Sequence, residues 1–340
     1  MAGRPAEPEW PEGGTLRAHP DLVRAALAEV AAIGPYFAIS TDPGVPGTGD
    51  LGASRSDGQW RPLSELAADT AALRARIDDF RRRLGTEESR VAASILFQGL
   101  AARLWSPVIG TVTTYGLVPA RAPADLRWRP APTGPLPLWT SPVSGWHVVP
   151  ELGKEWPGEP ILRTSQPPAS LRTTHASDDS PAEKPTNDAR ADQDSPDQRA
   201  PGRETADEEV AAVVYRVVVA DLLEPLVDAV RGITKISAGL LWGNAASSLA
   251  GTLRTLPATR PDLAPRAARL VRDVLGLGVL AGTGRLAEPA AGHHFFVRSS
   301  CCLYYRVPGG GMCDDCALLA PPVRDRQWAR TVRQARGAGT

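Results

Sequence analysis

The first 300 residues of this 340-residue chain contain no cysteine. The chain also lacks an uninterrupted apolar run of about 20 residues, the length that a bilayer span requires. Its most apolar stretch, residues 210–227, contains three charged residues. The amino-terminal residues show no apolar run typical of a signal peptide. We therefore expect a soluble, cytoplasmic protein with no membrane span.

A charge surplus is missing as well. Lys and Arg together number 38, and so do Asp and Glu, which gives a formal net charge of zero. Proteins whose main ligand is nucleic acid usually carry a surplus of Lys and Arg that neutralises phosphates. The glycine-rich fingerprints of phosphate and dinucleotide sites are also missing. We expect no nucleic-acid partner, and no flavin or nicotinamide motif suggests that the chain carries its own electron donor.

Helical patterns dominate the apolar residues that are present. Apolar side chains recur at helical spacing in residues 20–37, 62–84, 87–105, 210–231, 233–256 and 261–278. We expect Pro107 to end the third of these helices, because the residue before a proline disfavours helical geometry. The GTGRL stretch at 282–286 is expected to close a helix. Between 126 and 162, short runs of Trp and Val separated by Pro and Gly predict two or three strands.

The sequence thus predicts a predominantly α (α+β) fold, with helical lobes, a small β element and a cysteine-bearing loop near the carboxyl end. Between 165 and 209 the composition changes sharply, and Leu171 is the single large aliphatic residue there. Such a stretch buries too little apolar surface to offset the entropy of ordering it. The predicted organisation is a disordered terminus at 1–18, an N-terminal lobe at 19–164, a disordered insertion at 165–209, a C-terminal lobe at 210–322 and a basic tail at 323–340.

All four cysteines lie within sixteen positions, in the pattern C-C-x10-C-x2-C at 301, 302, 313 and 316. A C-x2-C pair is a common two-thiolate chelate, and the three glycines at 309–311 allow the positive φ angles of a wrapped loop. Adjacent cysteines on a strand would point to opposite faces. A shared site at Cys301 and Cys302 therefore requires a bent backbone.

Three kinds of site compete for these thiols. In a reducing compartment, clustered cysteines are more often metal ligands or redox groups than structural disulfides. A structural zinc site can use four thiolates, although such sites normally combine two C-x2-C chelates, and a redox dithiol is a second option. The third is a [2Fe–2S] cluster on four thiolates. One hypothesis for it places Cys301 and Cys302 on one iron and Cys313 and Cys316 on the other.

The segment FFVRSSCCLYYRVPGGGMCDDCAL, residues 295–318, resembles the carboxyl-terminal signature of FhuF-type ferric siderophore reductases. The Arg-x-Ser-Cys-Cys opening and the Tyr-Arg that follows agree with that family, and LLWGNAASSL at 240–249 is similar to a family segment upstream. The resemblance implies a [2Fe–2S] cofactor held by the four cysteines. It also implies one-electron reduction of siderophore-bound Fe(III), with an external electron donor.

Four other residues are candidates for contacts around the cluster or with the substrate. Arg298 and Arg306 flank the adjacent cysteines, where they either offset thiolate charge, meet an anionic chelate, or form ordinary surface ion pairs. Trp242 and Asn244 either lie near the substrate and brace the loop, or act as a core residue and a helix-end hydrogen bonder respectively. We favour the second interpretation for that pair.

Two acidic residues inside the C-x2-C motif, Asp314 and Asp315, are expected to face water. Beyond the cluster itself, no catalytic residue is predicted. Two other functions remain open. One is a non-catalytic iron–sulfur protein for electron transfer or sensing, and the other is a helical binding module stabilised by zinc.

Overall fold

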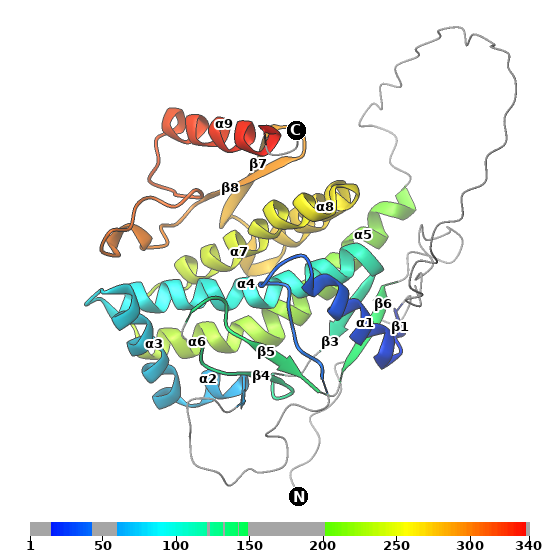
Figure 1. Cartoon of the computed structure of the whole chain (residues 1–340), viewed down its shortest axis with the longest axis horizontal. Helices are drawn as coiled ribbons and strands as arrows, with labels where there is room; N and C mark the ends of the chain where they lie inside the picture. Colours follow the sequence, from blue (N-terminus) through cyan, green and yellow to red (C-terminus); the bar gives the residue numbers. More distant parts are fainter. Residues whose placement is uncertain are drawn as a thin grey trace, which may run out of the picture.

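Helices predominate in this protein, as the sequence predicts. The computed structural model describes residues 15–42, 60–120, 123–131, 133–141, 143–148 and 201–337. Within them, helices are accompanied by three small sheets whose strands pair antiparallel (Figure 1). The predominantly α (α+β) class is thereby confirmed. Most of the predicted insertion and of the predicted disordered terminus lies outside the described residues.

Two long helices, α4 (Ser89–Tyr115) and α7 (Ala238–Thr259), pack against each other at the centre of the molecule (Figure 1). Phe97 and Trp105 of α4 and Leu249 of α7 are completely buried. Among the described residues, α4 alone is long and apolar enough to cross a membrane, but 78% of its apolar window is buried inside the protein. That burial is typical of the core helix of a soluble protein.

The helix α4 continues through Pro107, so the predicted break there is wrong. Proline supplies no backbone N–H and costs a helix interior about 3 kcal/mol. The side chains that follow it, Val108, Ile109 and Val112, are buried. Burying each such side chain contributes about 1.5–3 kcal/mol. Burial in the core therefore outweighs the local cost of the proline.

The remaining helices are arranged around the α4–α7 pair. They are α1 (Pro20–Ala31), α2 (Ser64–Ala68), α3 (Thr70–Leu84), α5 (Pro201–Tyr215), α6 (Glu224–Ile233), α8 (Ala264–Leu275) and α9 (Pro321–Gly337). A π-helical segment, Arg216–Leu223, joins α5 to α6, and short 3-10 turns lie at Pro261–Leu263, Gly278–Leu280 and Tyr304–Arg306. α5 begins at Pro201, nine residues before the predicted start of a helix, and α9 makes most of the basic tail helical.

Three small sheets complete the fold. The first sheet has the strand order β1 (Thr15–Arg17), β6 (Ser144–Val148), β3 (Leu117–Ala120). The second sheet has the order β2 (Arg61–Pro62), β4 (Leu126–Trp128), β5 (Leu138–Thr140). The third sheet is a hairpin of β7 (Gly284–Ala290) and β8 (His293–Arg298). The strands predicted between 126 and 162 are confirmed by β4, β5 and β6.

The hairpin β7–β8 corrects a prediction, because GTGRL leads into a strand and does not close a helix. Gly284 begins β7, and a Cβ atom there would lie only 2.3 Å from Cζ of Phe296 on β8. The two strands can pair at this point because residue 284 has no side chain. The glycine that suggested a helix end is therefore needed for the close approach of two strands.

One hydrophobic cluster includes residues from both sides of the predicted insertion. It contains Phe97 of α4, Leu249 of α7 and Phe296 of β8. The two predicted lobes therefore share a core, and the boundary at 165–209 stays a prediction. The loop 299–318, which carries all four cysteines, follows β8 and leads into α9 (orange in Figure 1).

Candidate metal centre

The loop 299–318 brings Cys302 and Cys313 together, with 3.5 Å between their Sγ atoms. All four cysteines are free thiols, two of them buried and two half-buried. A disulfide would require about 2.05 Å between the sulfur atoms. Two thiolates on one tetrahedral metal, each about 2.3 Å from it, lie about 3.8 Å apart. The Cys302–Cys313 spacing therefore suits two ligands of one metal ion.

The other two thiols accept hydrogen bonds from the backbone of the same loop. Cys301 accepts a hydrogen bond from the backbone N–H of Leu303 at 3.3 Å, and Cys316 accepts one from Leu318 at 3.4 Å. Burial raises the pKa of Cys301, and the charges of Cys302 and Cys316 act in the same direction. Cys301 is therefore within electrostatic range of both residues.

The predicted convergence of all four sulfur atoms is met only by Cys302 and Cys313. Within the described ranges, no three His, Cys, Asp or Glu side chains are grouped as ligands of a metal ion. The hypothesis for the cluster placed Cys302 and Cys313 on different iron atoms, whereas the structure brings these two sulfur atoms together. Ligation by all four cysteines stays a prediction.

The backbone bends directly after the adjacent cysteines. Leu303 has a φ of 67° and is the one non-glycine residue in the left-handed region within the described part of the chain. Gly309 also has a positive φ, of 71°. A Cβ atom on Gly310 would lie 2.7 Å from the carbonyl oxygen of Tyr304, whereas one on Gly311 would meet open space. Two of the three glycines are therefore required by the loop.

Cys302 and Cys313 share a hydrogen bond that changes both of their pKa values. The bond from Cys313 lowers the pKa of Cys302, and the same bond, together with burial, raises the pKa of Cys313. The hydrogen bond between the two sulfur atoms contains one proton, and either sulfur can be its donor. Because the thiolate is the form that binds metal, a metal ion at this site would displace that proton.

Arg298 ends β8 and is buried beside the loop, with 3% of its surface exposed. Its Nη1 donates a hydrogen bond to the side-chain oxygen of Asn244. Asn244 is fully buried within α7 and donates to both Oγ and the carbonyl oxygen of Ser94 on α4, each at 2.9 Å. The interpretation of Asn244 as a helix-end hydrogen bonder is therefore wrong, since it braces the loop from inside the helix.

Two further predicted candidates have structural roles. Trp242 belongs to the hydrophobic core, in agreement with the favoured interpretation. Arg306 forms a surface ion pair, with 2.6 Å between its Nε and Oε1 of Glu88, the residue that precedes α4. The ordinary interpretation thus holds for Arg306, whereas Arg298 is buried and its charge acts on the thiols of Cys301, Cys302 and Cys313.

The two aspartates of the C-x2-C motif face opposite ways. Asp314 is exposed and pairs with Arg254 of α7 at 3.2 Å. Asp315 is buried and accepts a hydrogen bond from Oγ of Ser247, and burial raises the pKa of this carboxyl group. The expectation that both face water is wrong for Asp315.

Sequence reasoning missed three residues that attach the loop. Ser94 donates to the carbonyl oxygen of Cys302 at 2.7 Å, and Ser247 donates to Asp315. Arg324 of α9 is buried and donates to the carbonyl oxygen of Cys316 at 3.1 Å. Ser94 is one of several polar residues in α4, so its place in that helix gave no signal. Partners so distant in sequence leave no local pattern.

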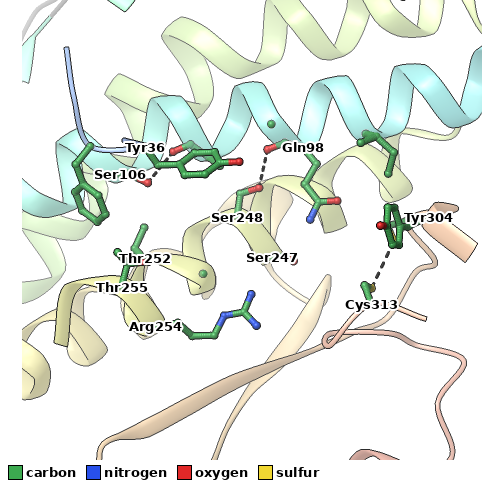
Figure 2. A pocket seen from close by; sticks show the side chains of 16 residues that line it. Tyr36, Gln98, Ser106, Ser247, Ser248, Thr252, Arg254, Thr255, Tyr304 and Cys313 are labelled. Atoms are coloured by element: carbon green, nitrogen blue, oxygen red, sulfur yellow. Dashed lines mark hydrogen bonds between the residues drawn. The ribbon is translucent and has the colours of Figure 1, made fainter. Parts of the chain in front are cut away.

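A cavity of about 470 Å³ lies between α4 and α7 and reaches Cys302 and Cys313. In Figure 2, Gln98 lies on one wall and Arg254 extends from the opposite helix, while Tyr304 and Cys313 close one end. The wall is mostly apolar and neutral, with hydroxyl and amide groups among its lining, and its one charged side chain, Arg254, is already paired with Asp314. A ligand in the cavity would therefore meet little excess charge.

The far end of the cavity is built by the segment after α1. Tyr36 lines the cavity there (Figure 2). Arg103 of α4 is buried and donates hydrogen bonds to the carbonyl oxygens of Pro35, Tyr36 and Ala38. Burial lowers the pKa of Arg103 to about 10. The cavity wall is thus fixed to the central helix by a buried guanidinium.

Residues 298–318 match the family model of the FhuF 2Fe-2S C-terminal domain. This segment is similar to FhuF-type 2Fe-2S domains. The match includes all four cysteines and Arg298, and it indicates a [2Fe–2S] cluster as the cofactor. The search of curated proteins found no match to the chain. The FhuF-type domain spans the cysteine loop alone, so it identifies the cofactor and leaves the reaction to be inferred.

The residues of the FhuF-type domain fit such a cluster. Cys302 and Cys313 already have a spacing suited to one metal ion, and backbone N–H groups donate to the sulfur atoms of Cys301 and Cys316. Arg298 adds a buried positive charge, as expected beside a group with a net negative charge. Hydrogen bonds to sulfur and nearby charge are the main protein contributions to cluster potential.

Proposed function

We propose that the chain is a [2Fe–2S] oxidoreductase that reduces the ferric ion of a siderophore by one electron and so releases ferrous iron. The observation that carries this proposal is the cavity beside Cys302 and Cys313. Most of its wall comes from α4 and α7, outside the FhuF-type domain. A cavity beside two predicted cluster ligands gives an external complex access to the cofactor.

When bound, the cluster supplies single-electron transfer. The net reaction takes one electron from an external reduced carrier and gives it to the ferric ion, so the carrier is oxidised as the iron becomes ferrous. Siderophores bind through hard oxygen donors, which hold ferrous iron less tightly than ferric iron. The iron then dissociates, and the freed oxygen atoms take up protons from water. No covalent bond of the siderophore needs to break.

The chain's own residues would act mainly by positioning. Cys302 and Cys313 line the cluster end of the cavity, and Tyr304 lies beside Cys313 (Figure 2). Arg254 extends into the space between α4 and α7, with Asp314 balancing its charge. The proposal places the protein in the cytoplasm, with a ferric siderophore and an external electron donor as partners and without nucleic acid.

A non-catalytic iron–sulfur carrier or sensor is the second candidate. A carrier needs only an exposed cluster edge, whereas this chain surrounds a cavity beside two of the cysteines. The cavity favours ligand binding and hence a reductase. The zinc-stabilised module is disfavoured, because the family matched by the loop carries a [2Fe–2S] cluster.

The test is anaerobic turnover with purified protein. The cluster is reduced with dithionite, the excess dithionite is removed by desalting, and a panel of ferric siderophores of different ligand types is added. A ferrous-specific chelator then reports iron release, while the visible spectrum reports reoxidation of the cluster. We expect release of one ferrous ion for each cluster reoxidised with at least one siderophore. A fully reduced cluster that releases no iron from any member of the panel would contradict the reductase and favour the carrier.

A further inference from the structure

Arg298 is a buried cation whose charge acts on the buried carboxyl group of Asp315 only at longer range than an ion pair. No carboxylate in the described ranges forms an ion pair with it. Its Nε and Nη2 are buried and have no hydrogen-bond partner among the described residues. A buried charge with free donors is costly unless something compensates it. This arrangement indicates that a negatively charged group belongs beside the guanidinium.

The direction of this missing partner is given by the cysteines. The positive charge of Arg298 acts on the thiols of Cys301, Cys302 and Cys313. Its backbone N–H also donates to the carbonyl oxygen of Asp315 at 3.1 Å, which joins the end of β8 to the second cysteine pair. Arg298 is thus bound to both halves of the loop and lies within electrostatic range of three of the four thiols.

A relay of buried side chains fixes the guanidinium. Asn244 accepts from Nη1 of Arg298 and donates to Ser94, which in turn donates to the carbonyl oxygen of Cys302 at 2.7 Å. Both ends of the relay therefore attach to the cysteine loop, and its middle lies on α7 and α4. One nitrogen of the guanidinium, Nη1, is held, and the other two, Nε and Nη2, remain free to donate to another acceptor.

We infer that Arg298 is the electrostatic partner of the cluster, donating from Nε and Nη2 to sulfur and raising the reduction potential, with Asn244 and Ser94 holding it in place. A [2Fe–2S] cluster on four thiolates is net negative and gains one further negative charge on reduction. A fixed cation stabilises the reduced form more than the oxidised form. The inference rests on the [2Fe–2S] cofactor and is independent of which substrate receives the electron.

The experiment measures the midpoint potential of the cluster by a redox titration followed by EPR. The test variants are Arg298→Gln, which removes the charge, and Arg298→Lys, which keeps the charge and loses the forked geometry. Arg306→Gln is the matched control, because it removes a cation from the same loop that is exposed and paired with Glu88. Activity is not needed for any of these measurements.

We expect Arg298→Gln to lower the equilibrium constant for reduction at least tenfold, which corresponds to about 59 mV for a one-electron couple. Arg298→Lys should give an intermediate change, and Arg306→Gln should leave the potential at the wild-type value. An Arg298→Gln protein with an intact cluster and a wild-type potential would overturn the inference.

A second variant covers the case in which Arg298→Gln holds no cluster. Asn244→Asp is nearly isosteric and places a carboxylate against Nη1 of Arg298, so it offsets the charge without removing the arginine. A lowered potential in this variant supports the inference, and an unchanged one overturns it. If neither variant binds the cluster, the melting temperatures of the cluster-free variants are compared with that of the cluster-free wild type. Wild-type values assign the residues to the cluster, whereas a large decrease assigns a purely structural role and overturns the inference.

Discussion

The interface between α4 and α7 and the loop 299–318 are stabilised by different contacts. The helices meet through completely buried side chains such as Phe97 and Leu249. The loop exposes several large side chains, including Tyr305 and Met312, and is attached by hydrogen bonds from Ser94 and other polar groups. Stability and cofactor chemistry therefore depend on separate residues. Substitutions should separate the two properties.

The largest effect on stability is expected in the helical core. Phe97→Ala removes a fully buried ring and should lower the free energy of unfolding by about 3–5 kcal/mol. Denaturant titration of the purified protein measures this change. Met312→Ala in the loop is the control, because Met312 is half exposed and its loss should change stability by less than about 0.5 kcal/mol. Equal losses of unfolding free energy in the two variants would contradict the separation of stability from cofactor chemistry.

The loop should fail differently, by losing its cluster before its fold. Gly310→Ala places a Cβ atom 2.7 Å and 2.8 Å from two carbonyl oxygens, and such crowding costs about 1–3 kcal/mol. We expect the variant to be purified with most of its iron and sulfide missing but with the circular dichroism of the wild type. Gly311→Ala is the matched control, since a Cβ atom there meets open space. The account is wrong at this point if both variants retain the same cluster content.

A smaller effect is expected where the two regions meet. Ser94→Ala removes the bond to the carbonyl oxygen of Cys302 and one bond from Asn244, and buried groups left without partners cost about 1–3 kcal/mol. We expect faster loss of iron to a chelator. Ser106→Ala is the control, because it lies in the same helix but bonds within that helix to Ala102. Identical rates of iron loss would show that the loop does not depend on Ser94.

The smallest effect is expected at the surface ion pair. The hydrogen bond from Arg306 lowers the pKa of Glu88, so the carboxylate stays ionised throughout the neutral range. Exposed ion pairs contribute little and are screened by salt. Glu88→Gln should lower the melting temperature slightly at low ionic strength, and the difference from wild type should vanish in high salt. A large decrease that persists in salt would show that this contact anchors the loop.

The cofactor could be predicted from sequence because the chemistry of thiols is restricted. Four of them within sixteen positions have few uses other than binding metal or redox chemistry. A bent backbone at Cys301 and Cys302 followed from the need for their side chains to face one site, whereas the positive φ of Leu303 was not predicted. The hydrogen bonds of Ser94 and Asn244 that hold the loop could not be predicted from the sequence. These two residues are 150 positions apart and meet only through the packing of α4 against α7.

The wrong predictions about Pro107, Gly284 and Asp315 also arise from contacts between residues far apart in sequence. Pro107 suggests a helix end by local preference, but the burial of the residues that follow it keeps α4 continuous. Gly284 suggests a helix end, yet its role is to let β7 approach Phe296. Asp315 suggests a solvated position, yet Ser247 of α7 binds it in the interior. In each case a contact from a distant element decided the outcome.

The most direct test of the central claim is the iron and inorganic sulfide content of anaerobically purified protein, measured with the EPR spectrum of the reduced form. The account predicts two irons and two sulfides per chain and the signal of a reduced [2Fe–2S] cluster, both lost when Cys301, Cys302, Cys313 or Cys316 is replaced singly by serine. Protein that contains no iron and sulfide, or that binds zinc in their place, would contradict it. So would a set of serine variants that all retain the wild-type cluster.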